Sequence, residues 1–434
     1  MENNIVLIGM PGSGKSALGR HAAKELNIRF MDLDARIEKL EGMSIPEIFA
    51  THGEEYFRAL ETKTLEDFNN FGHRTILAVG GGTPMREVNV QLLHKIGYII
   101  FINRNIDAIA KYMNYNGNRP LLNNQEKLYE LYKERYPIYE AACDYKIDLD
   151  TNLEASVTLL KTVIRGQFPD TTYGVIGDPI AHSISPKLHD IVYRYLRINN
   201  DYAAIYVSRG GIASFIKRAI DSGMKGFNAT IPHKIDILPY LDEISADGAA
   251  CGAVNTIKIS DGKLYGHNTD MGGLLMAVDR KGYAYKDNNI VIIGEGGAAY
   301  SIIAKAQMEQ AKSITVLARN PKQEDTTKWD FLGSHPAFGE ADLVFNATPL
   351  GMHGIHSDFK SFEFLDDIPK SALVYDLVYT PSETKLLAEA KKRGLTTENG
   401  LSMLIYQGLL ADAYWLDQEL PLDELYNVVY EAIS

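Results

Sequence analysis

The sequence predicts an α/β protein of two parts, each built on mainly parallel sheets. A strand, a glycine-rich turn and a helix follow one another at residues 4–26, and the same order returns at residues 290–306. Such units are typical of parallel sheets covered by helices. The length of 434 residues exceeds one ordinary domain and suits two or three.

Composition limits the class of protein. The chain is 45% hydrophobic and 23% charged, as globular proteins are, and its net charge of −12 argues against a duplex nucleic-acid partner. No apolar run approaches the ~20 residues of a membrane span, and the N-terminus reads as a strand rather than a signal peptide. The two cysteines, Cys143 and Cys251, are far apart, so we expect a cytoplasmic protein with neither a membrane nor a nucleic-acid partner.

The first glycine-rich turn, residues 9–16, matches the phosphate-loop pattern G-x-x-x-x-G-K-[ST] in full. Its N–H groups can curl around phosphate oxygens, and the helix that follows adds partial positive charge. We expect it to bind ATP with Mg²⁺, where Lys15 reaches the outer phosphates and Ser16 binds the metal. The predicted nucleotide contacts are Gly12, Ser13, Gly14, Lys15 and Ser16.

Polar residues beyond this loop are candidates to hold the phosphoryl acceptor. Asp32 and Asp34 stand two apart at a predicted strand end, hence on one side of an extended chain, although capping of the next helix is an equal alternative. Other candidates lie on a helix, in a glycine run that ends a buried strand, in a loop and at a predicted helix start: Arg58, Gly81 and Gly82, Arg119, and Arg135.

In this order the motifs resemble shikimate kinase over nearly all of residues 3–165. The resemblance implies that shikimate is held by Asp34, Arg58, Gly81, Gly82 and Arg135, while Arg119 closes over the phosphates. A carboxylate substrate needs arginine forks, and Asp34 can accept a hydrogen bond from the attacking hydroxyl, as a base or as a positioning group. Lys15, Asp34 and Arg119 form the expected catalytic set, with Asp32 reaching Mg²⁺ through water.

A helix over residues 151–164 is expected to close this first part. Leu153, Val157, Leu160 and Ile164 recur there at helical spacing. The connection between the two parts then follows at residues 166–172.

The second part opens with a predicted strand and then Ser183 and Ser185, just before a proline. Proline is favoured in the first turn of a helix, so Ser185 by itself reads as an N-cap. A later strand leads to Lys234, residues 261–262 predict the turn of a hairpin, and Asp270 follows that hairpin.

The second glycine-rich turn follows the strand at residues 290–293 and opens a helix, as in dinucleotide sites. An acidic residue after the next strand would bind the ribose of NAD, whereas Arg319 with Lys322 suits the 2′-phosphate of NADP. The expected cofactor contacts are Gly294, Gly296, Gly297, Ala298, Arg319, Lys322, Asn346 and Thr348.

These segments together resemble shikimate dehydrogenase over essentially all of residues 172–434. The resemblance implies that Lys234 and Asp270 form the catalytic pair and that NADPH reduces the ketone of 3-dehydroshikimate. An ammonium group can protonate the oxygen that hydride delivery leaves charged, and a carboxylate can hold that ammonium. The implied substrate contacts are Ser183, Ser185, Thr230, Asn255, Asp270 and Gln407, with Tyr379 beside the site.

Two positions depart from the family pattern. Glu295 stands in the glycine-rich turn where the family usually has a small residue, and its carboxylate would repel a pyrophosphate unless it turned outward. Ala318 stands where the family often has asparagine.

The two resemblances support one another, because shikimate is the product of one implied reaction and the acceptor of the other. We expect a kinase-like P-loop domain at residues 1–168, a substrate subdomain at 171–270 with 404–434, and a Rossmann-like NADP subdomain at 271–403. The oligomeric state does not follow from the sequence.

Two alternatives stay open. In the first, the chain is another small-molecule kinase fused to a quinate-type dehydrogenase. In the second, one half is a catalytically silent binding or regulatory module. Arg58, Arg135 and the paired serines count against the first, and the intact Lys15 and Lys234 count against the second.

Overall fold

The computed structural model describes residues 4–68, 74–116, 125–149, 152–167, 169–331, 333–354 and 357–434, without the side chains of residues 112–116 and 125. It divides into two compact units, residues 1–169 and 170–434. Within the described ranges, no helix has the length and apolar character needed to span a bilayer.

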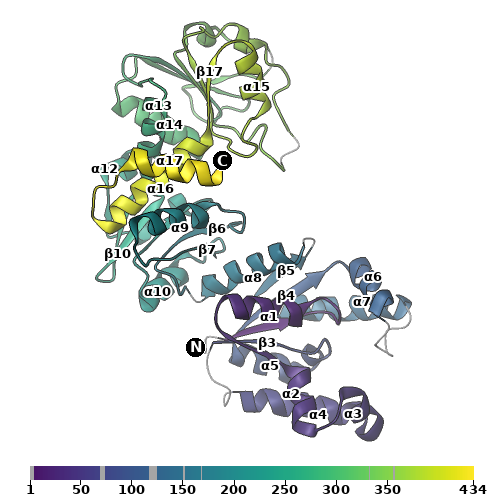
Figure 1. Ribbon diagram of the computed structural model, residues 1–434. Coiled ribbons are helices and arrows are strands. Elements are labelled where there is room, and N and C mark those ends of the chain that lie inside the picture. The colour runs from purple at the N-terminus through teal and green to yellow at the C-terminus, as the bar shows by residue number, and fades with distance from the viewer. Residues whose placement is uncertain are drawn as a thin grey trace. The chain divides into compact units, whose positions relative to one another are not determined.

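The first unit is a five-stranded parallel sheet with helices around it, in the strand order β2-β3-β1-β4-β5 (Figure 1). Its strands are β1 (Ile5–Ile8), β2 (Arg29–Asp32), β3 (Thr75–Ala78), β4 (Tyr98–Arg104) and β5 (Tyr145–Leu149). Its helices are α1 (Lys15–Glu25), α2 (Leu33–Glu41), α3 (Ile45–His52), α4 (Glu54–Glu66), α5 (Glu87–Ile96), α6 (Ile106–Asn116), α7 (Gln125–Ala142) and α8 (Leu153–Gln167). β1 and β3 are buried along their whole length, as strands of a covered parallel sheet should be.

The chain leaves β2 earlier than the sequence predicts. β2 ends at Asp32, whose carboxylate accepts a hydrogen bond from the N–H of Ala35 at 3.3 Å and so caps α2. Asp34 therefore lies in the first turn of a helix, and the expectation of an extended chain through Asp34 is wrong. Capping prevails because a helix start leaves backbone N–H groups without partners inside the helix.

Arg135 lies inside α7 rather than at a helix start, since the helix continues through Pro137. A proline removes one internal hydrogen bond, but packing on both sides of it can hold the helix together. Tyr139 supplies such packing here, because its ring is fully buried and its hydroxyl donates to the carbonyl oxygen of Gly81 at 2.5 Å.

The closing helix is α8, which begins at Leu153 and continues to Gln167, beyond the end predicted for it. Val157, Leu160 and Ile164 are buried as the spacing predicts, whereas Leu153, the first residue of the helix, is 50% exposed. The apolar stripe of this helix therefore begins one turn later than predicted.

The second unit contains two sheets. The first is mixed, in the order β7-β6-β8-β10-β11-β9. Its strands are β6 (Tyr173–Gly177), β7 (Tyr202–Tyr206), β8 (Gly226–Ala229), β9 (Glu243–Ile244), β10 (Thr256–Ser260) and β11 (Lys263–His267). The helices of this region are α9 (Ser185–Leu196), α10 (Ile212–Ser222), α11 (His233–Asp236) and α12 (Ala246–Cys251). The predicted hairpin turn is confirmed: β10 and β11 pair antiparallel, and Asp261 and Gly262 both have positive φ, as a two-residue hairpin turn requires.

The other sheet of this unit is parallel throughout, in the order β14-β13-β12-β15-β16-β17. Its strands are β12 (Asn289–Ile293), β13 (Ser313–Ala318), β14 (Thr326–Lys328), β15 (Leu343–Asn346), β16 (Leu373–Asp376) and β17 (Thr396–Asn399). The remaining helices are α13 (Thr269–Asp279), α14 (Gly297–Met308), α15 (Lys385–Lys392), α16 (Gly400–Leu416) and α17 (Leu422–Ile433). The terminal helices thus begin at Gly400 rather than near Leu404, because Asn399 caps α16 by accepting from the N–H of Leu401.

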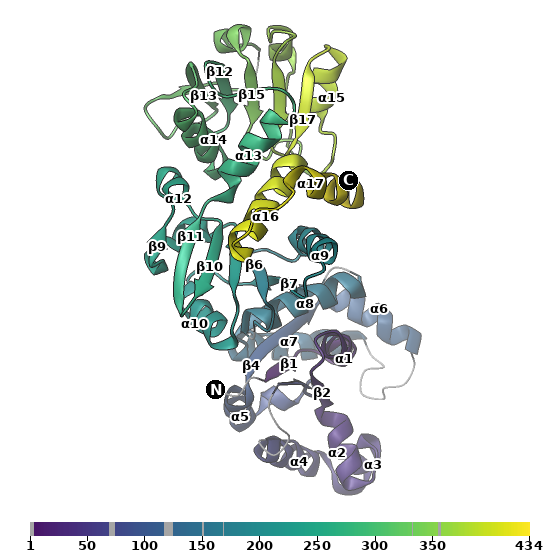
Figure 2. The same cartoon turned by 60° about the vertical axis from the view of Figure 1, so that its left-hand side comes forward.

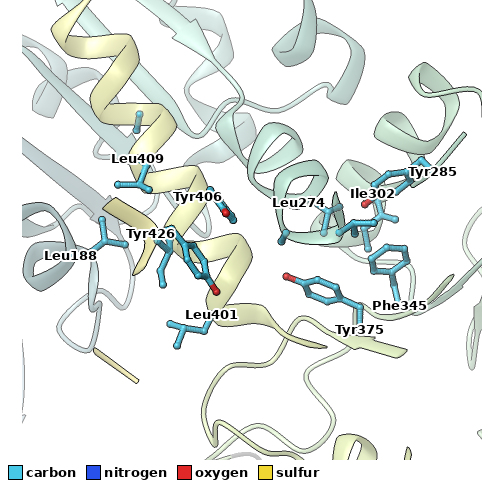
Figure 3. Close-up of a cluster of buried hydrophobic side chains, with 14 of the residues drawn as sticks. Leu188, Leu274, Tyr285, Ile302, Phe345, Tyr375, Leu401, Tyr406, Leu409 and Tyr426 are labelled. Atoms are coloured by element: carbon cyan, nitrogen blue, oxygen red, sulfur yellow. The ribbon is translucent and has the colours of Figure 1, made fainter. Parts of the chain in front are cut away.

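One apolar core joins the two sheets of the second unit. It includes Leu188 of α9, Leu274 of α13, Phe345 of β15 and Leu409 of α16, and Figure 3 shows α13 and α16 side by side within it. The backbones approach closely, since a Cβ on Gly273 would lie 2.7 Å from the backbone nitrogen of Gln407. In both overall views α16 lies between the sheet of β6 and the sheet of β12 (Figures 1 and 2).

Candidate active sites

The phosphate loop connects β1 to α1 at the carboxyl edge of the first sheet. Lys15 is buried, and its ammonium donates to the carbonyl oxygens of Gly9 at 2.8 Å and Met10 at 2.9 Å. These contacts keep the charge inside the loop. The N-terminal N–H groups of α1 and this ammonium together form a site suited to phosphate oxygens.

The two predicted metal residues lie together. The hydroxyl of Ser16 donates to the carboxylate of Asp32 at 2.5 Å, so the loop and the end of β2 present oxygen atoms at one point. Mg²⁺ prefers oxygen ligands and usually keeps several waters, so two protein oxygens fit this ion.

Three glycines, Gly80, Gly81 and Gly82, lie close to the phosphate loop and to the residues predicted to hold the phosphoryl acceptor. A Cβ on Gly80 would lie 2.8 Å from the Asp34 carboxylate, and a Cβ on Gly81 would lie 2.6 Å from the ring of Pro11. A Cβ on Gly82 would lie 2.5 Å from the guanidinium of Arg58. Without side chains there, Asp34 and Arg58 can face a ligand beside the phosphate loop.

Arg58 is held by two carboxylates of its own helix, Glu61 at 2.7 Å and Glu54 at 2.9 Å. Burial disfavours its charge, but Glu61 and Glu54 outweigh burial and raise the pKa of the Arg58 guanidinium. Arg135 lies near Tyr139, whose pKa burial raises to about 12, and the charge of Arg135 opposes this effect. Arg119 lies outside the described residues.

A cavity of about 310 Å³ lies beside α11, α13 and α16 of the second unit. It is lined by all the predicted substrate residues of this unit and by the predicted catalytic lysine, namely Ser183, Ser185, Thr230, Asn255, Asp270, Tyr379 and Gln407, and Lys234. Lys234 and Asp270 meet with an Nζ–Oδ2 distance of 2.5 Å. The Lys234 side chain is 33% exposed and that of Asp270 is 11% exposed, and both residues line the cavity.

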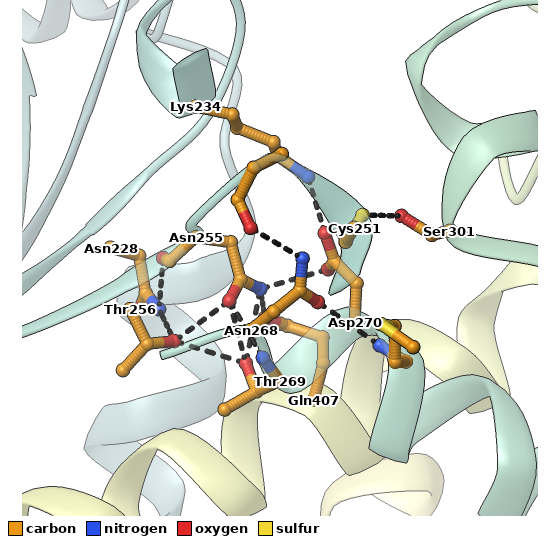
Figure 4. Close-up of polar contacts among 12 residues, drawn as sticks. Asn228, Lys234, Cys251, Asn255, Thr256, Asn268, Thr269, Asp270, Ser301 and Gln407 are labelled. Atoms are coloured by element: carbon orange, nitrogen blue, oxygen red, sulfur yellow. Dashed lines mark hydrogen bonds and ion pairs between the residues drawn. The ribbon is translucent and has the colours of Figure 1, made fainter. Parts of the chain in front are cut away.

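Asp270 is fixed by its own network (Figure 4). The Asn255 amide donates to Asp270 at 2.9 Å and to the hydroxyl of Thr269 at 3.0 Å. Asn228 donates to the carbonyl oxygen of Asn255 and to the hydroxyl of Thr256, both at 3.0 Å. These bonds hold the Asp270 carboxylate in one orientation, because rotation would leave buried polar groups without partners.

The two predicted serines, Ser183 and Ser185, also line the cavity. Ser185 is the first residue of α9 and its side chain does not cap the helix, so the N-cap interpretation is wrong. The hydroxyl of Ser183 instead accepts from the N–H of Ser185 at 3.3 Å. Tyr379 lines the cavity as well, and burial raises the pKa of its phenol.

The second glycine-rich turn leads from β12 into α14. Gly294 has φ of 108°, and a Cβ on Gly296 or Gly297 would meet no atom within 4 Å, so the space before the helix N-terminus is open to a ligand. A cavity of about 240 Å³ next to it is lined by Gly294, Glu295, Arg319, Lys322 and Thr348, among others. Open backbone N–H groups next to two basic residues fit a dinucleotide with a phosphorylated ribose.

Glu295 does turn outward. Its carboxylate accepts from the backbone N–H groups of Lys322 at 2.7 Å and Gln323 at 2.8 Å, beyond the end of β13. The carboxylate thus lies at the loop that follows β13.

Asn346 is the last residue of β15 and is fully buried. Its amide donates to Asp376 at 2.9 Å and its oxygen accepts from the hydroxyl of Thr348 at 2.6 Å. Thr348 lines the cavity and Asn346 does not. Burial raises the pKa of Asp376 to about 6, although hydrogen bonds from Thr384, Val378 and Asn346 oppose the increase.

The second unit is similar in sequence to known proteins. A shikimate dehydrogenase (NADP(+)) of Methanocaldococcus jannaschii is 38% identical over 273 residues, which are 60% of this chain and 96% of that protein. The chain belongs to the shikimate dehydrogenase family. The family model of the shikimate dehydrogenase substrate binding domain matches residues 175–257, and the shikimate kinase model matches residues 11–165.

Two solved structures share the fold of the shikimate dehydrogenase part. A chorismate mutase/shikimate 5-dehydrogenase fusion protein from Clostridium acetobutylicum aligns with a TM-score of 0.54 and 30% identity, over 60% of this chain and 97% of that chain. Shikimate 5-dehydrogenase from Thermus thermophilus, in complex with NADP(H) and shikimate, aligns with a TM-score of 0.54 and 28% identity. The alignment covers 60% of this chain and 99% of that chain. The predicted α/β fold is confirmed, and so is the predicted order of the two parts, one similar to shikimate kinase and then one of shikimate dehydrogenase.

Sequence reasoning missed several residues that hold these sites. Glu61 is fully buried beneath Arg58, and its position three residues later on the same helix was the available signal. Asn228 and Thr269 both bond to Asn255, which in turn donates to Asp270. Their motif positions were visible in the sequence, but their contacts with Asn255 depend on the sheet.

Proposed function

We propose that this chain catalyses two consecutive steps. The shikimate dehydrogenase part reduces the ketone of 3-dehydroshikimate to shikimate with NADPH, and the shikimate kinase part transfers a phosphoryl group from ATP to the 3-hydroxyl of shikimate. The observation that carries the proposal is the Lys234–Asp270 pair, which faces a polar cavity of about 310 Å³.

In the reduction, NADPH supplies the hydride that reaches the carbonyl carbon, which leaves negative charge on the oxygen. The ammonium of Lys234 donates a proton to that oxygen, and Asp270 holds the ammonium in place. Asn255 keeps Asp270 oriented toward the lysine. Ser183, Ser185, Thr230, Asn255 and Gln407 hydrogen-bond the substrate, and Tyr379 lies beside it.

In the phosphoryl transfer, the protein mainly aligns charges. Ser16 and Asp32 would hold Mg²⁺, Lys15 binds the outer phosphates, and Arg58 with Arg135 binds the substrate carboxylate. Asp34 accepts a hydrogen bond from the attacking hydroxyl and Arg119 neutralises phosphate charge.

The parts of the chain divide the work. Residues 1–168 act as the kinase, 171–270 with 404–434 bind the dehydrogenase substrate, and 271–403 bind NADP. The acidic net charge and the family memberships support a cytoplasmic enzyme of small-molecule metabolism that acts without nucleic acid.

The test is a single reaction of purified protein with 3-dehydroshikimate, NADPH, ATP and Mg²⁺, followed by NADPH absorbance and mass spectrometry. We expect shikimate 3-phosphate only when both cosubstrates are present. Replacement of Lys234 by Ala should stop NADPH oxidation while added shikimate is still phosphorylated, because the two sites lie on different units.

Other outcomes would favour the alternatives. If shikimate accumulates without phosphorylation, the first unit has another acceptor or is silent. If quinate is oxidised by NADP⁺ faster than shikimate, the second unit is a quinate-type dehydrogenase.

A further inference from the structure

Glu295 places a carboxylate where the cofactor ribose would be recognised. It follows the first glycine of the turn, yet it bonds to the backbone N–H groups of Lys322 and Gln323, four residues or less beyond Arg319. Glu295, Arg319 and Lys322 line the same cavity of about 240 Å³. The site therefore presents one carboxylate and two basic side chains to one small volume.

The two backbone N–H groups are the first point of the argument. Adjacent N–H groups that point the same way form an anion site, and a 2′-phosphate is an anion that could use them. Here they bind a carboxylate from the protein itself, at 2.7 and 2.8 Å. A 2′-phosphate must therefore rely on Arg319 and Lys322 or displace Glu295.

Charge is the second point. A carboxylate and a phosphate within one small cavity repel each other, which weakens binding of the phosphorylated ribose. A free 2′-hydroxyl behaves in the opposite way, because a carboxylate accepts its hydrogen bond and thereby selects NAD. Arg319, whose guanidinium lies 5.7 Å from the centre of the Phe331 ring, remains available for the phosphate.

We propose that Glu295 determines cofactor choice in this chain by lowering its preference for NADP(H) over NAD(H). The site combines the arginine of an NADP enzyme with the carboxylate of an NAD enzyme, so both cofactors are used. This assignment rests on the proposed reductase function of the second unit.

The test compares binding of NADP⁺ and NAD⁺ to the full chain by isothermal titration calorimetry. Glu295→Gln removes the charge and keeps one hydrogen-bond acceptor for the loop. We expect it to tighten NADP⁺ binding about fivefold to tenfold and to leave NAD⁺ binding unchanged or weaker. Glu295→Ala should shift the ratio of the two dissociation constants in the same direction.

Glu324→Gln is the matched control, because it removes the same charge from the exposed loop that carries Lys322 and Gln323, whose N–H groups bond to Glu295 instead. It should change neither dissociation constant by more than about twofold. Steady-state rates of the wild-type chain with NADH and NADPH provide a second measurement, and we expect turnover with both.

The outcomes separate clearly. Weaker NADP⁺ binding in Glu295→Gln would mean that Glu295 only holds the loop, and an effect equal to that of Glu324→Gln would mean that only net charge matters; either result overturns the assignment. If neither dinucleotide binds the wild-type chain, the proposed reductase function itself fails, and the assignment fails with it.

Discussion

The two glycine-rich turns use the same backbone arrangement in two different sheets. In each, the first glycine has positive φ, 145° at Gly9 and 108° at Gly294. Each lies close to a neighbouring strand: a Cβ on Gly9 would lie 2.5 Å from the oxygen of Ile102 in β4, and a Cβ on Gly294 would lie 2.8 Å from Thr348, just after β15. Both turns then open a helix whose N-terminal N–H groups can bind phosphate.

The side chains of the two turns carry opposite charges. Lys15 lies inside the first turn and donates to its carbonyl groups, whereas Glu295 lies at the rim of the second and accepts from N–H groups of another loop. Under the proposed function, the first turn adds positive charge for a triphosphate, and the second leaves the pyrophosphate to the backbone. The backbone would then determine where phosphate binds, and the side chains would determine which nucleotide is selected.

The largest expected effect comes from removing the charge inside the first turn. Lys15→Met should lower shikimate phosphorylation at least ~1000-fold, because the ammonium neutralises charge on the transferred group. NADPH oxidation with 3-dehydroshikimate should stay within about twofold of the wild-type rate, since the second turn lacks this lysine. Both rates are measured on one protein preparation, and loss of both would contradict the independence of the two turns.

The second prediction separates backbone strain from ligand contact in one turn. Gly294→Ala should lower the free energy of unfolding by about 2–4 kcal/mol. The backbone at this position has a positive φ, which strains an alanine, and the added Cβ would clash with Thr348. Gly296→Ala should leave the melting temperature nearly unchanged but weaken NADP⁺ binding, because its Cβ enters open space beside the pyrophosphate.

Thermal unfolding and NADP⁺ titration of the two glycine variants are the measurements. Equal losses of melting temperature would show that the space before α14 serves packing rather than a ligand.

Much of this arrangement could be predicted because it depends on local signals. Glycine-rich turns, buried strands and helix spacing are encoded within a few residues, and the carboxyl ends of parallel strands lie at one edge of a sheet. Lys234 and Asp270 are 36 residues apart, yet the hairpin and β8 bring them to 2.5 Å as the family resemblance implied.

The features that the sequence did not predict depend on contacts between segments that are distant along the chain. Arg135 lies inside a helix because packing of Tyr139 on Gly81 outweighs the helix-breaking tendency of Pro137. The direction of Glu295 is determined by two N–H groups that lie 27 and 28 residues later. Neither the course of the helix at Pro137 nor the direction of Glu295 follows from local sequence, because each depends on residues distant along the chain.

A third prediction concerns the support behind the second turn, where Asp376 holds Asn346 and through it Thr348. The pKa of Asp376 is raised from 3.8 to about 6, chiefly by burial, so the folded state binds a proton more readily than the unfolded state. That contribution to stability is fully present below about pH 4 and is lost as pH rises through about 6. The loss is on the order of 3 kcal/mol, at about 1.4 kcal/mol per pKa unit.

Asp376→Asn keeps an oxygen for Asn346 and Val378 but carries no charge. Denaturant unfolding of both proteins from pH 4 to pH 8 should show the variant gaining stability relative to wild type as pH rises. A constant difference across this range would mean that Asp376 does not titrate between the two states.

The smallest effect should come from the side chains that distinguish the two cofactors. Arg319→Ala should weaken NADP⁺ binding about 10- to 50-fold, because a guanidinium can bind a phosphate through two N–H groups. Lys322→Ala should weaken it less, since an ammonium acts as a single charge. NAD⁺ binding should stay within about twofold in both variants, because its pyrophosphate relies on the N–H groups of α14. Titration with both dinucleotides measures this, and equal weakening of the two would mean that Arg319 supports the turn itself. Selective weakening would establish that the turn binds the pyrophosphate whichever ribose follows.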